Sequence, residues 1–390
     1  MHAMAIIHFL KNNYLFKMWT SADAIIDYLV FAKKYISDCE EHYGINEVEA
    51  ILDACHALMN YGVDRYKHPA PLSMQEEKIR QQNREIYMQS QVNELWRTIP
   101  HSKQVVSQSQ KKRFPEEPQE NILYFIEKNA PLLEPWQREI VRIVRKMAQY
   151  FYPQGQTKVM NEGWACFWHY TILHALYDEG LVTDEFMLEI LQSHTNVIMQ
   201  PPYNSPYYSG INPYTLGYHM MQDIKRICEN PTEEDKRWFP YLANTNWLTS
   251  LDTAMRNYKD ESFIAQYLSP KLIRDLKLFH IVDDDRSPDL YVNAIHNESG
   301  YQKIREALSR QYNLGYFEPD IQVYSIDLQG DRSMTLRYAQ HNRVPLGNTT
   351  TDVLKHLYSL WKFPIVLQAA NSENEITQEY HCPPKPLPNT

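Results

Sequence analysis

The chain has 390 residues, which is enough for two domains that each bury a hydrophobic core. Its hydrophobic content of 43% is that of an ordinary globular protein, and the sequence has no run of about 18 apolar residues that would predict a membrane span. The net charge is −9 and the lysines and arginines are scattered, which argues against a dedicated nucleic-acid-binding protein.

The cysteines and the N-terminal residues indicate the cellular compartment of the protein. The five cysteines are odd in number and widely spaced, and none forms a CxxC pair, so a reducing cytoplasm fits better than a secreted disulfide framework. The N-terminal stretch lacks the basic start and small-residue cleavage site of a signal peptide. The predicted location is the cytoplasm. The 28 tyrosines and 11 glycines indicate a helix-rich protein with aromatic surfaces or grooves.

Up to about residue 265 the sequence predicts helices. Thr20 and Ser21 are candidate caps for the first of the longer helices, and Asn46 precedes Glu49 by three residues, as in a capping box. Pro135 falls in the first turn of a later helix. Helices are expected over residues 20–44, 46–62, 134–153, 158–180 and 183–194.

Two segments interrupt this helical pattern. Residues 69–119 are Gln-rich and charged without periodicity, so we expect a partly helical, partly flexible insertion. Residues 199–220 contain four prolines, two glycines and five tyrosines, which predicts an irregular segment. Such a segment either lines a groove or lies over helices, and the sequence leaves both open.

After residue 270 the period changes from helical to alternating. Residues 320–328 and 333–341 alternate on both sides of a Gln-Gly-Asp turn, which predicts a hairpin. Short strands, a helix at 298–313, a helix at 350–363 and a last strand surround it. The predicted fold class is α+β: a mainly helical N-terminal domain over residues 1–265, then a smaller α+β domain with a mainly antiparallel sheet over 270–370. Residues 371–390 are expected to form a disordered tail.

Residues 158–170, KVMNEGWACFWHY, place a carboxylate and an imidazole in an apolar helix. Glu162 and His169 are seven residues apart, so on a helix they point within about 20° of each other. An unpaired buried carboxylate costs several kcal/mol, so Glu162 needs a cation, hydrogen-bond donors or water. Metal ligation and a buried ion pair between helices both satisfy this requirement. His169 fits a metal ligand or an ordinary hydrogen-bonded core histidine.

Several stretches together carry a family signature: KNNYLFKMWTSADAIIDYLVFAKKYI, DACHALMNYGVDRY, HLYSLWKFPIVL and the central block from NILYF to CFWHY. They resemble the SpoVR family, the stage V sporulation protein R-like proteins, from about residue 8 to 370. The resemblance implies a link to spore cortex formation in Bacillus relatives. It also implies two partners from the gene neighbourhood, a PrkA-like serine kinase and a von Willebrand-type domain protein.

The N-terminal stretch departs from the family pattern. Family members have a longer N-terminal portion and a motif of the form HAxxGHxHFF before KNN, where this chain has MHAMAIIHFL. Aligned without gaps, only the last histidine survives, as His8, and His2 matches only with a one-residue deletion. The resemblance therefore predicts that a helical N-terminal portion is missing.

The family motif also implies a metal site. Two histidines on one helix and a glutamate from a second helix form gluzincin-type zinc sites, and NEGWA is similar to the EGWA helix that supplies that glutamate. By this analogy zinc is the expected ion, and Glu162, His169 and His8 are the candidate ligands. The motif has alanine where HExxH enzymes have their general base, so a standard protease mechanism does not transfer.

Three functions remain open from the sequence. The first is a metal-dependent hydrolase of peptide or cell-wall amide bonds. The second is a non-enzymatic partner protein in a kinase-regulated stress or sporulation pathway, with the α+β domain as its docking surface. The third is an inactive fragment of either. A complete set of metal ligands would favour the hydrolase.

Overall fold

The computed structural model describes residues 1–19, 22–65, 113–202, 205–282, 291–294, 296–313, 318–339, 346–371, 373 and 375–384. The candidate caps Thr20 and Ser21 lie outside these residues, as does the predicted insertion except for residues 113–119.

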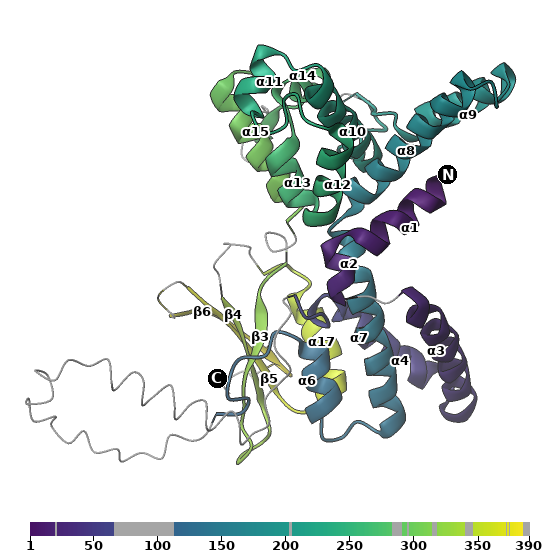
Figure 1. Cartoon of the computed structure of the whole chain (residues 1–390). Helices are drawn as coiled ribbons and strands as arrows, with labels where there is room; N and C mark the ends of the chain where they lie inside the picture. The colour runs from purple at the N-terminus through teal and green to yellow at the C-terminus, as the bar shows by residue number, and fades with distance from the viewer. Residues whose placement is uncertain are drawn as a thin grey trace, which may run out of the picture. The chain divides into compact units, whose positions relative to one another are not determined.

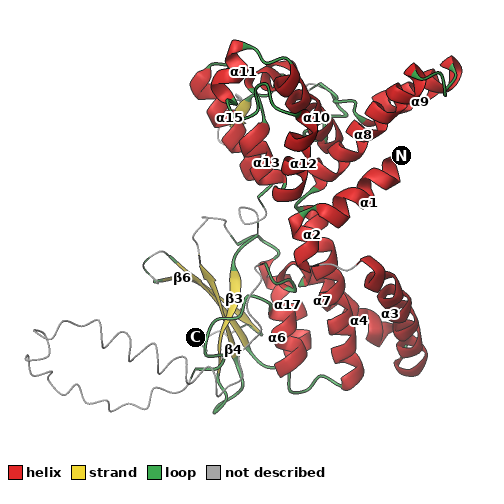
Figure 2. Ribbon diagram, in the orientation of Figure 1, coloured by secondary structure: helices red, strands yellow, loops and turns green. Residues whose placement is uncertain are grey.

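Helices run along most of the described chain, and Figures 1 and 2 show them with the strands. The helices are α1 (His2–Asn12), α2 (Tyr14–Trp19), α3 (Ala22–Tyr43), α4 (Ile45–Ala57), η1 (Met59–Tyr61), α6 (Ile122–Asn129), α7 (Pro135–Gly155), α8 (Lys158–Asp178), α9 (Asp184–Val197), α10 (Pro213–Glu229), α11 (Glu233–Trp238), α12 (Trp247–Asn257), α13 (Asp260–Tyr267), α14 (Pro270–Asp275), α15 (Glu298–Gln311) and α17 (Thr350–Trp361). The strands are β1 (His280–Val282), β2 (Tyr291–Ala294), β3 (Ile321–Ile326), β4 (Met334–Ala339), β5 (Ile365–Ala370) and β6 (Ile376–Cys382).

The α+β fold class is confirmed. A four-stranded sheet has the order β3-β4-β5-β6, and the predicted hairpin is present because β3 and β4 pair antiparallel. The β4–β5 pair is parallel, which requires the crossover that α17 provides, and β5–β6 is again antiparallel. One face of the sheet is buried, and α6 and α17 lie on the same side of it (Figure 1).

Four local expectations differ from the structure. Residues 376–382, placed in a disordered tail, form β6 along β5, although their mostly exposed side chains carry no apolar alternation. Helix α10 begins at Pro213, inside the segment expected to be irregular, because Asn212 caps its first turn. Pro153 lies within the last turn of α7 and does not end it. Asn46 lies inside α4, not before it.

Contacts between Cα atoms divide the chain into two compact units, each made of separate stretches of sequence. The helical unit contains residues 1–48, 143–319 and 341–346, and the sheet unit contains residues 49–142, 320–340 and 347–390. These units differ from the two consecutive domains expected, 1–265 and 270–370. Helix α15 belongs to the helical unit because Tyr301, Ile304 and Leu308 pack in its core.

Helices α8 and α10 cross at two glycines within the core of the helical unit. A Cβ atom on Gly217 would lie 2.0 Å from the carbonyl oxygen of Val159, and one on Gly163 would lie 2.4 Å from the carbonyl carbon of Gly217. No other residue type permits this approach, because Cβ atoms do not come so close to backbone atoms. The crossing sets the first turn of α10 against the part of α8 that contains Glu162.

A buried carboxylate fixes the start of α8. Thr157 makes no side-chain cap there. The Asp260 carboxylate instead accepts hydrogen bonds of 2.9 Å from the backbone N–H groups of Val159 and Met160, and the Asp260 N–H donates to the Gln156 carbonyl. These contacts satisfy N–H groups that a helix N-terminus leaves unpaired. They bind α8 to α13, about a hundred residues further along the chain.

A helix that crosses a membrane needs about 20 predominantly apolar residues. None of the described helices is both long enough and apolar enough to cross a bilayer.

Candidate functional site

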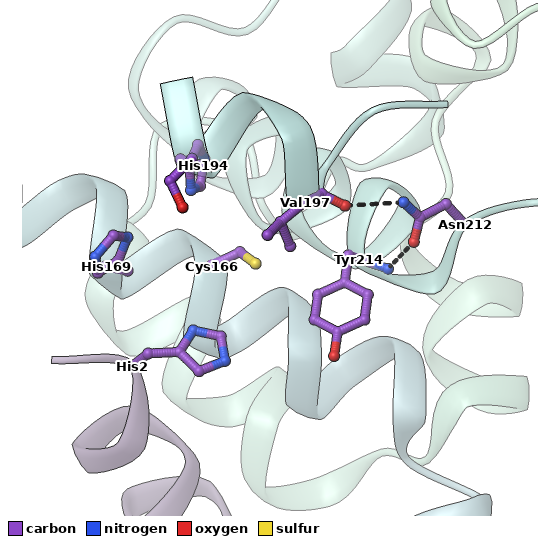
Figure 3. Close-up of a pocket in the computed structure, with 8 residues that line it drawn as sticks. His2, Cys166, His169, His194, Val197, Asn212 and Tyr214 are labelled. Carbon is purple, nitrogen blue, oxygen red and sulfur yellow. Dashed lines mark hydrogen bonds between the residues drawn. The ribbon is translucent and has the colours of Figure 1, made fainter. Parts of the chain in front are cut away.

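A cavity of about 640 Å³ opens in the helical unit. Helices α1, α8, α9 and the start of α10 form its walls (Figure 3). Its volume is in the range of small-molecule sites. The lining residues are His2, Cys166, His169, Ser193, His194, Val197, Asn212 and Tyr214.

Glu162 and His169 are brought together through a residue of α1. Glu162, Cys166 and His169 follow one another at i, i+4 and i+7, so they share one face of α8. The Nε2 atom of His2 lies 3.9 Å from Oε2 of Glu162, and the ring centroids of His2 and His169 are 6.4 Å apart. His2 therefore stands between the two candidate residues of α8.

His8 has a different surrounding. Its ring is exposed on α1 and stacks on the Trp164 ring, with centroids 5.8 Å apart and an interplanar angle of 10°. His8 is not among the residues that line the cavity. Of the three candidate ligands, the structure groups Glu162 with His169 and places His8 over an indole.

Two histidines of the cavity, His169 and His194, are held in their neutral form. Burial, then the nearby charges of His2 and the N-terminal amine, lower the pKa of His169. Burial, followed by His169 and other neighbouring imidazoles, lowers the pKa of His194 to about 4. His194 is only 7% exposed, and its Nε2 has no hydrogen-bond partner among the described residues. Neutral imidazoles keep a free nitrogen lone pair, which is what a metal ion or a ligand donor requires.

The thiol and phenol of the cavity are also protonated. Burial, and next the charge of Glu162, raise the pKa of Cys166 to about 12, so this thiol is unreactive by itself. Burial, and next the charge of Glu162 and a hydrogen bond to it, raise the pKa of Tyr214. Tyr214 thus supplies a hydroxyl beside the carboxylate.

Asn212 joins two walls of the cavity. Its side-chain oxygen accepts from the Tyr214 N–H at 3.0 Å, and its amide donates to the Val197 carbonyl at 2.9 Å (Figure 3). Its own N–H donates to the side chain of Gln200. Asn212 therefore ties the end of α9 to the start of α10 and positions Tyr214.

The candidate ligand atoms of the cavity are of the kinds that bind zinc, but the distances between them are wider than in a zinc site. Two ligand atoms of one tetrahedral zinc lie roughly 3.3 Å apart, so the 3.9 Å between His2 and Glu162 is slightly wider. His169 lies further from this pair. Within the described ranges, no three His, Cys, Asp or Glu side chains converge closely enough to hold a metal ion. Imidazole and carboxylate are nevertheless the ligands that zinc prefers, and two of them face each other.

Comparison with protein families accounts for nearly the whole chain. Residues 1–317 match the model described as SpoVR like protein, and residues 319–372 match the SpoVR-like C-terminal domain. This chain belongs to the SpoVR family. The boundary between the two family models lies next to the boundary at residues 319 and 320 between the helical unit and the sheet unit.

A relative shares most of this SpoVR-family sequence. The protein described as "Uncharacterized protein YcgB" from Escherichia coli (strain K12) is 63% identical over 377 residues, which cover 97% of this chain and 74% of the relative. No solved structure matches the chain.

Four titratable residues of the cavity were not proposed from the sequence as site residues, although His2 was matched to the family motif with a one-residue deletion. Cys166 follows Glu162 by four residues and precedes His169 by three, so the helical spacing that linked the other two could have revealed it. His2, His194 and Tyr214 come from other helices, and no local pattern connects them with α8.

Proposed function

We propose that this chain binds a transition-metal ion, with zinc as the expected ion, in the cavity between α1, α8 and α9. We further propose that it hydrolyses an amide bond in a peptide or cell-wall substrate. The observation that carries this proposal is the approach of His2 to Glu162 at 3.9 Å, with His169 beside them at the wall of the cavity.

His2, Glu162 and His169 would hold the ion. A bound zinc supplies a Lewis acid and lowers the pKa of a water molecule. The lowered pKa of His169 favours this role, because a neutral imidazole releases no proton when it binds a metal. Closing the ligand set requires His169 to approach the other two residues.

Other residues of the chain prepare the site. The Tyr214 hydroxyl interacts with Glu162 and so restrains the carboxylate that faces His2. Asn212 holds Tyr214 in place through the first turn of α10. Val197 forms an apolar part of the wall.

Metal binding by the purified full chain tests the proposal. We expect one equivalent of zinc by elemental analysis, and visible absorption of a tetrahedral site after loading with cobalt(II). Glu162→Gln and His2→Gln should each weaken zinc binding by at least about tenfold, since even residues that only support a ligand contribute this much. Hydrolysis would then be assayed with peptide and peptidoglycan substrates.

The matched control is His42→Gln. His42 is exposed on α3, where it contacts the Asp38 carbonyl of its own helix. This variant should bind zinc like the wild type. Equal metal content in all variants, or no metal in the wild type, would refute the metal site and favour the non-enzymatic role.

The proposed partners and pathway rest on the resemblance to the SpoVR family. The expected partners are the PrkA-like serine kinase and the von Willebrand-type domain protein, in sporulation or in a stress response. Affinity purification of the tagged chain from its own host tests the association, and both partners are expected to co-purify. Failure to recover either protein would remove the association and leave the metal site unaffected.

A further inference from the structure

Two arginines of the sheet unit share one tyrosine ring. The guanidinium carbon of Arg337 on β4 lies 3.7 Å from the ring centroid of Tyr324, and that of Arg113 lies 4.4 Å from it. Cations are attracted to the faces of aromatic rings, so the ring holds both arginines in place. Two permanent positive charges thus gather at one point of the sheet.

These arginines differ from the paired arginines of the chain. Arg142, Arg226 and Arg274 each contact a carboxylate, at 3.0, 2.7 and 2.6 Å. Among the described residues, no carboxylate lies at ion-pair distance from Arg113 or Arg337. The charge at the tyrosine is therefore not neutralised by this part of the chain.

Two carboxylates of the surrounding chain accept hydrogen bonds from amide side chains. Gln322 and Gln368 are the cross-strand neighbours of Arg337 on β3 and β5. The amide of Gln322 donates to Asp320 at 3.2 Å, and that of Gln368 donates to Glu379 at 2.9 Å. Glu379 is also 3.0 Å from His381.

A β-bulge builds the cluster. The pairing of β3 with β4 skips Tyr324, so Val323 pairs with Leu336 and Ser325 with Thr335. Val323 and Ile326 are buried, while Tyr324 between them is only partly buried. Bulges re-aim side chains, and this one brings the ring beneath Arg337 on the neighbouring strand.

Arg337 also has an unused donor. Its Nε is buried and has no hydrogen-bond partner among the described residues. Leaving a charged donor unpaired is unfavourable, and an external acceptor would relieve it. Arg113, in contrast, is anchored by a 2.8 Å hydrogen bond to the Glu116 carbonyl.

We propose that Arg113, Tyr324 and Arg337 form a binding site for a phosphoryl group, either free phosphate or a phosphate monoester. Planar guanidinium groups match phosphate oxygens in geometry and charge, and the two arginines offer several donors to one anion. A hydrogen bond from Arg113, and then the charges of Arg337 and Arg113, lower the pKa of Tyr324, which reflects the positive potential at the ring. This site is independent of the proposed metal cavity.

Titration calorimetry of the full chain with inorganic phosphate and with AMP, a phosphate monoester, tests the site. The wild type should bind at least one of the two, and the pair distinguishes free phosphate from a monoester. Arg337→Gln should weaken binding by at least about tenfold, the effect of losing a charge-assisted hydrogen bond. Arg113→Gln should act in the same direction.

Lys355→Gln is the matched control. Lys355 is an exposed cation of the sheet unit that pairs with Asp352, so its removal changes the net charge equally. It should change the affinity less than twofold. Arg337→Lys keeps the charge without the planar fork, so it should bind phosphate with an affinity between those of the wild type and Arg337→Gln. This variant provides the test if Arg337→Gln does not fold. No binding of either anion at millimolar concentration, or an equal loss in the Lys355 variant, would overturn the proposal.

Discussion

In the helical unit, α8 and α10 touch through backbone atoms at Gly163 and Gly217, whereas in the sheet unit a bulge at Tyr324 removes one residue from the β3–β4 pairing. Both backbone features determine where residues of a proposed site lie. The glycine crossing sets the start of α10 against Glu162, and the bulge brings Tyr324 to Arg337. The first leaves no space for a single methyl group. The second shifts the register by one residue, and the pairs on both sides of the bulge remain intact. The cavity should therefore depend on packing, and the phosphoryl site on charge.

The two sites also differ in the charges they present. The cavity collects imidazoles that burial keeps neutral, together with the Glu162 carboxylate. The sheet site collects the positively charged guanidinium groups of two arginines. Lone-pair donors suit a cation and fixed positive charges suit an anion, so the two units are expected to bind ligands of opposite sign.

The largest expected effect tests the helix crossing. Gly217→Ala should lower the free energy of unfolding of the helical unit by about 3 kcal/mol or more, because the new methyl group overlaps the Val159 carbonyl. Gly155→Ala is the control, since a Cβ there meets nothing within 4 Å, and it should change stability by less than about 0.5 kcal/mol. Urea unfolding and hydrogen exchange of α8 peptides measure both. A neutral Gly217→Ala variant would show that the helices separate freely.

A smaller effect tests how α8 begins. Asp260→Ala should destabilise the helical unit by about 2 to 3 kcal/mol, because two buried N–H groups lose their acceptor. Asp260→Asn keeps one acceptor oxygen and should lose less. Asp352→Ala, at the exposed start of α17, serves as control and should leave the free energy of unfolding nearly unchanged. Exchange rates of the first turn of α8 distinguish the variants, and equal rates would contradict the capping role.

Low pH should destabilise the helical unit through the Asp235 carboxyl group. Burial tends to raise the pKa of Asp235, but hydrogen bonds from Arg226 and Thr232 outweigh it and lower the pKa to about 2. A carboxyl whose pKa is lower in the folded state stabilises the fold above its unfolded pKa of about 3.8. This stability is lost as the pH falls toward 2, at a slope of at most about 1.4 kcal/mol per pH unit. Thermal melts of the wild type and Asp235→Asn measure it, and identical slopes would contradict the assignment.

The smallest expected effect tests whether the sheet site depends on charge alone. Arg337→Gln should change the free energy of unfolding by less than about 1 kcal/mol, since it removes a cation that has no described carboxylate partner. Its phosphate affinity should fall all the same. Denaturant unfolding gives the first quantity. A loss of stability as large as that of Gly217→Ala would mean that Arg337 is a structural residue and would break the comparison.

Local patterns in the sequence determined much of the secondary structure. The helical period predicted α8, α9, α15 and α17, and two-residue alternation around a Gln-Gly-Asp turn predicted the β3–β4 hairpin. The seven-residue spacing of Glu162 and His169 placed them on one side of α8. These features depend on residues that are near one another in the chain, so periodicity and turn chemistry are sufficient to reveal them.

Only the tertiary structure decided which distant segments supply the other residues of the cavity and of the arginine site. His2 and His194 reach the α8 cavity, and Arg113 reaches Tyr324, across long stretches of sequence. Strand β6 has too little apolar alternation to be predicted, and it exists because β5 offers it an edge to pair with. Helix α15 joins the helical unit because its apolar face packs there, although its sequence neighbours are strands. Such placements are set by packing between distant segments, which depends on shape and burial in the whole unit and leaves no periodic trace in the sequence.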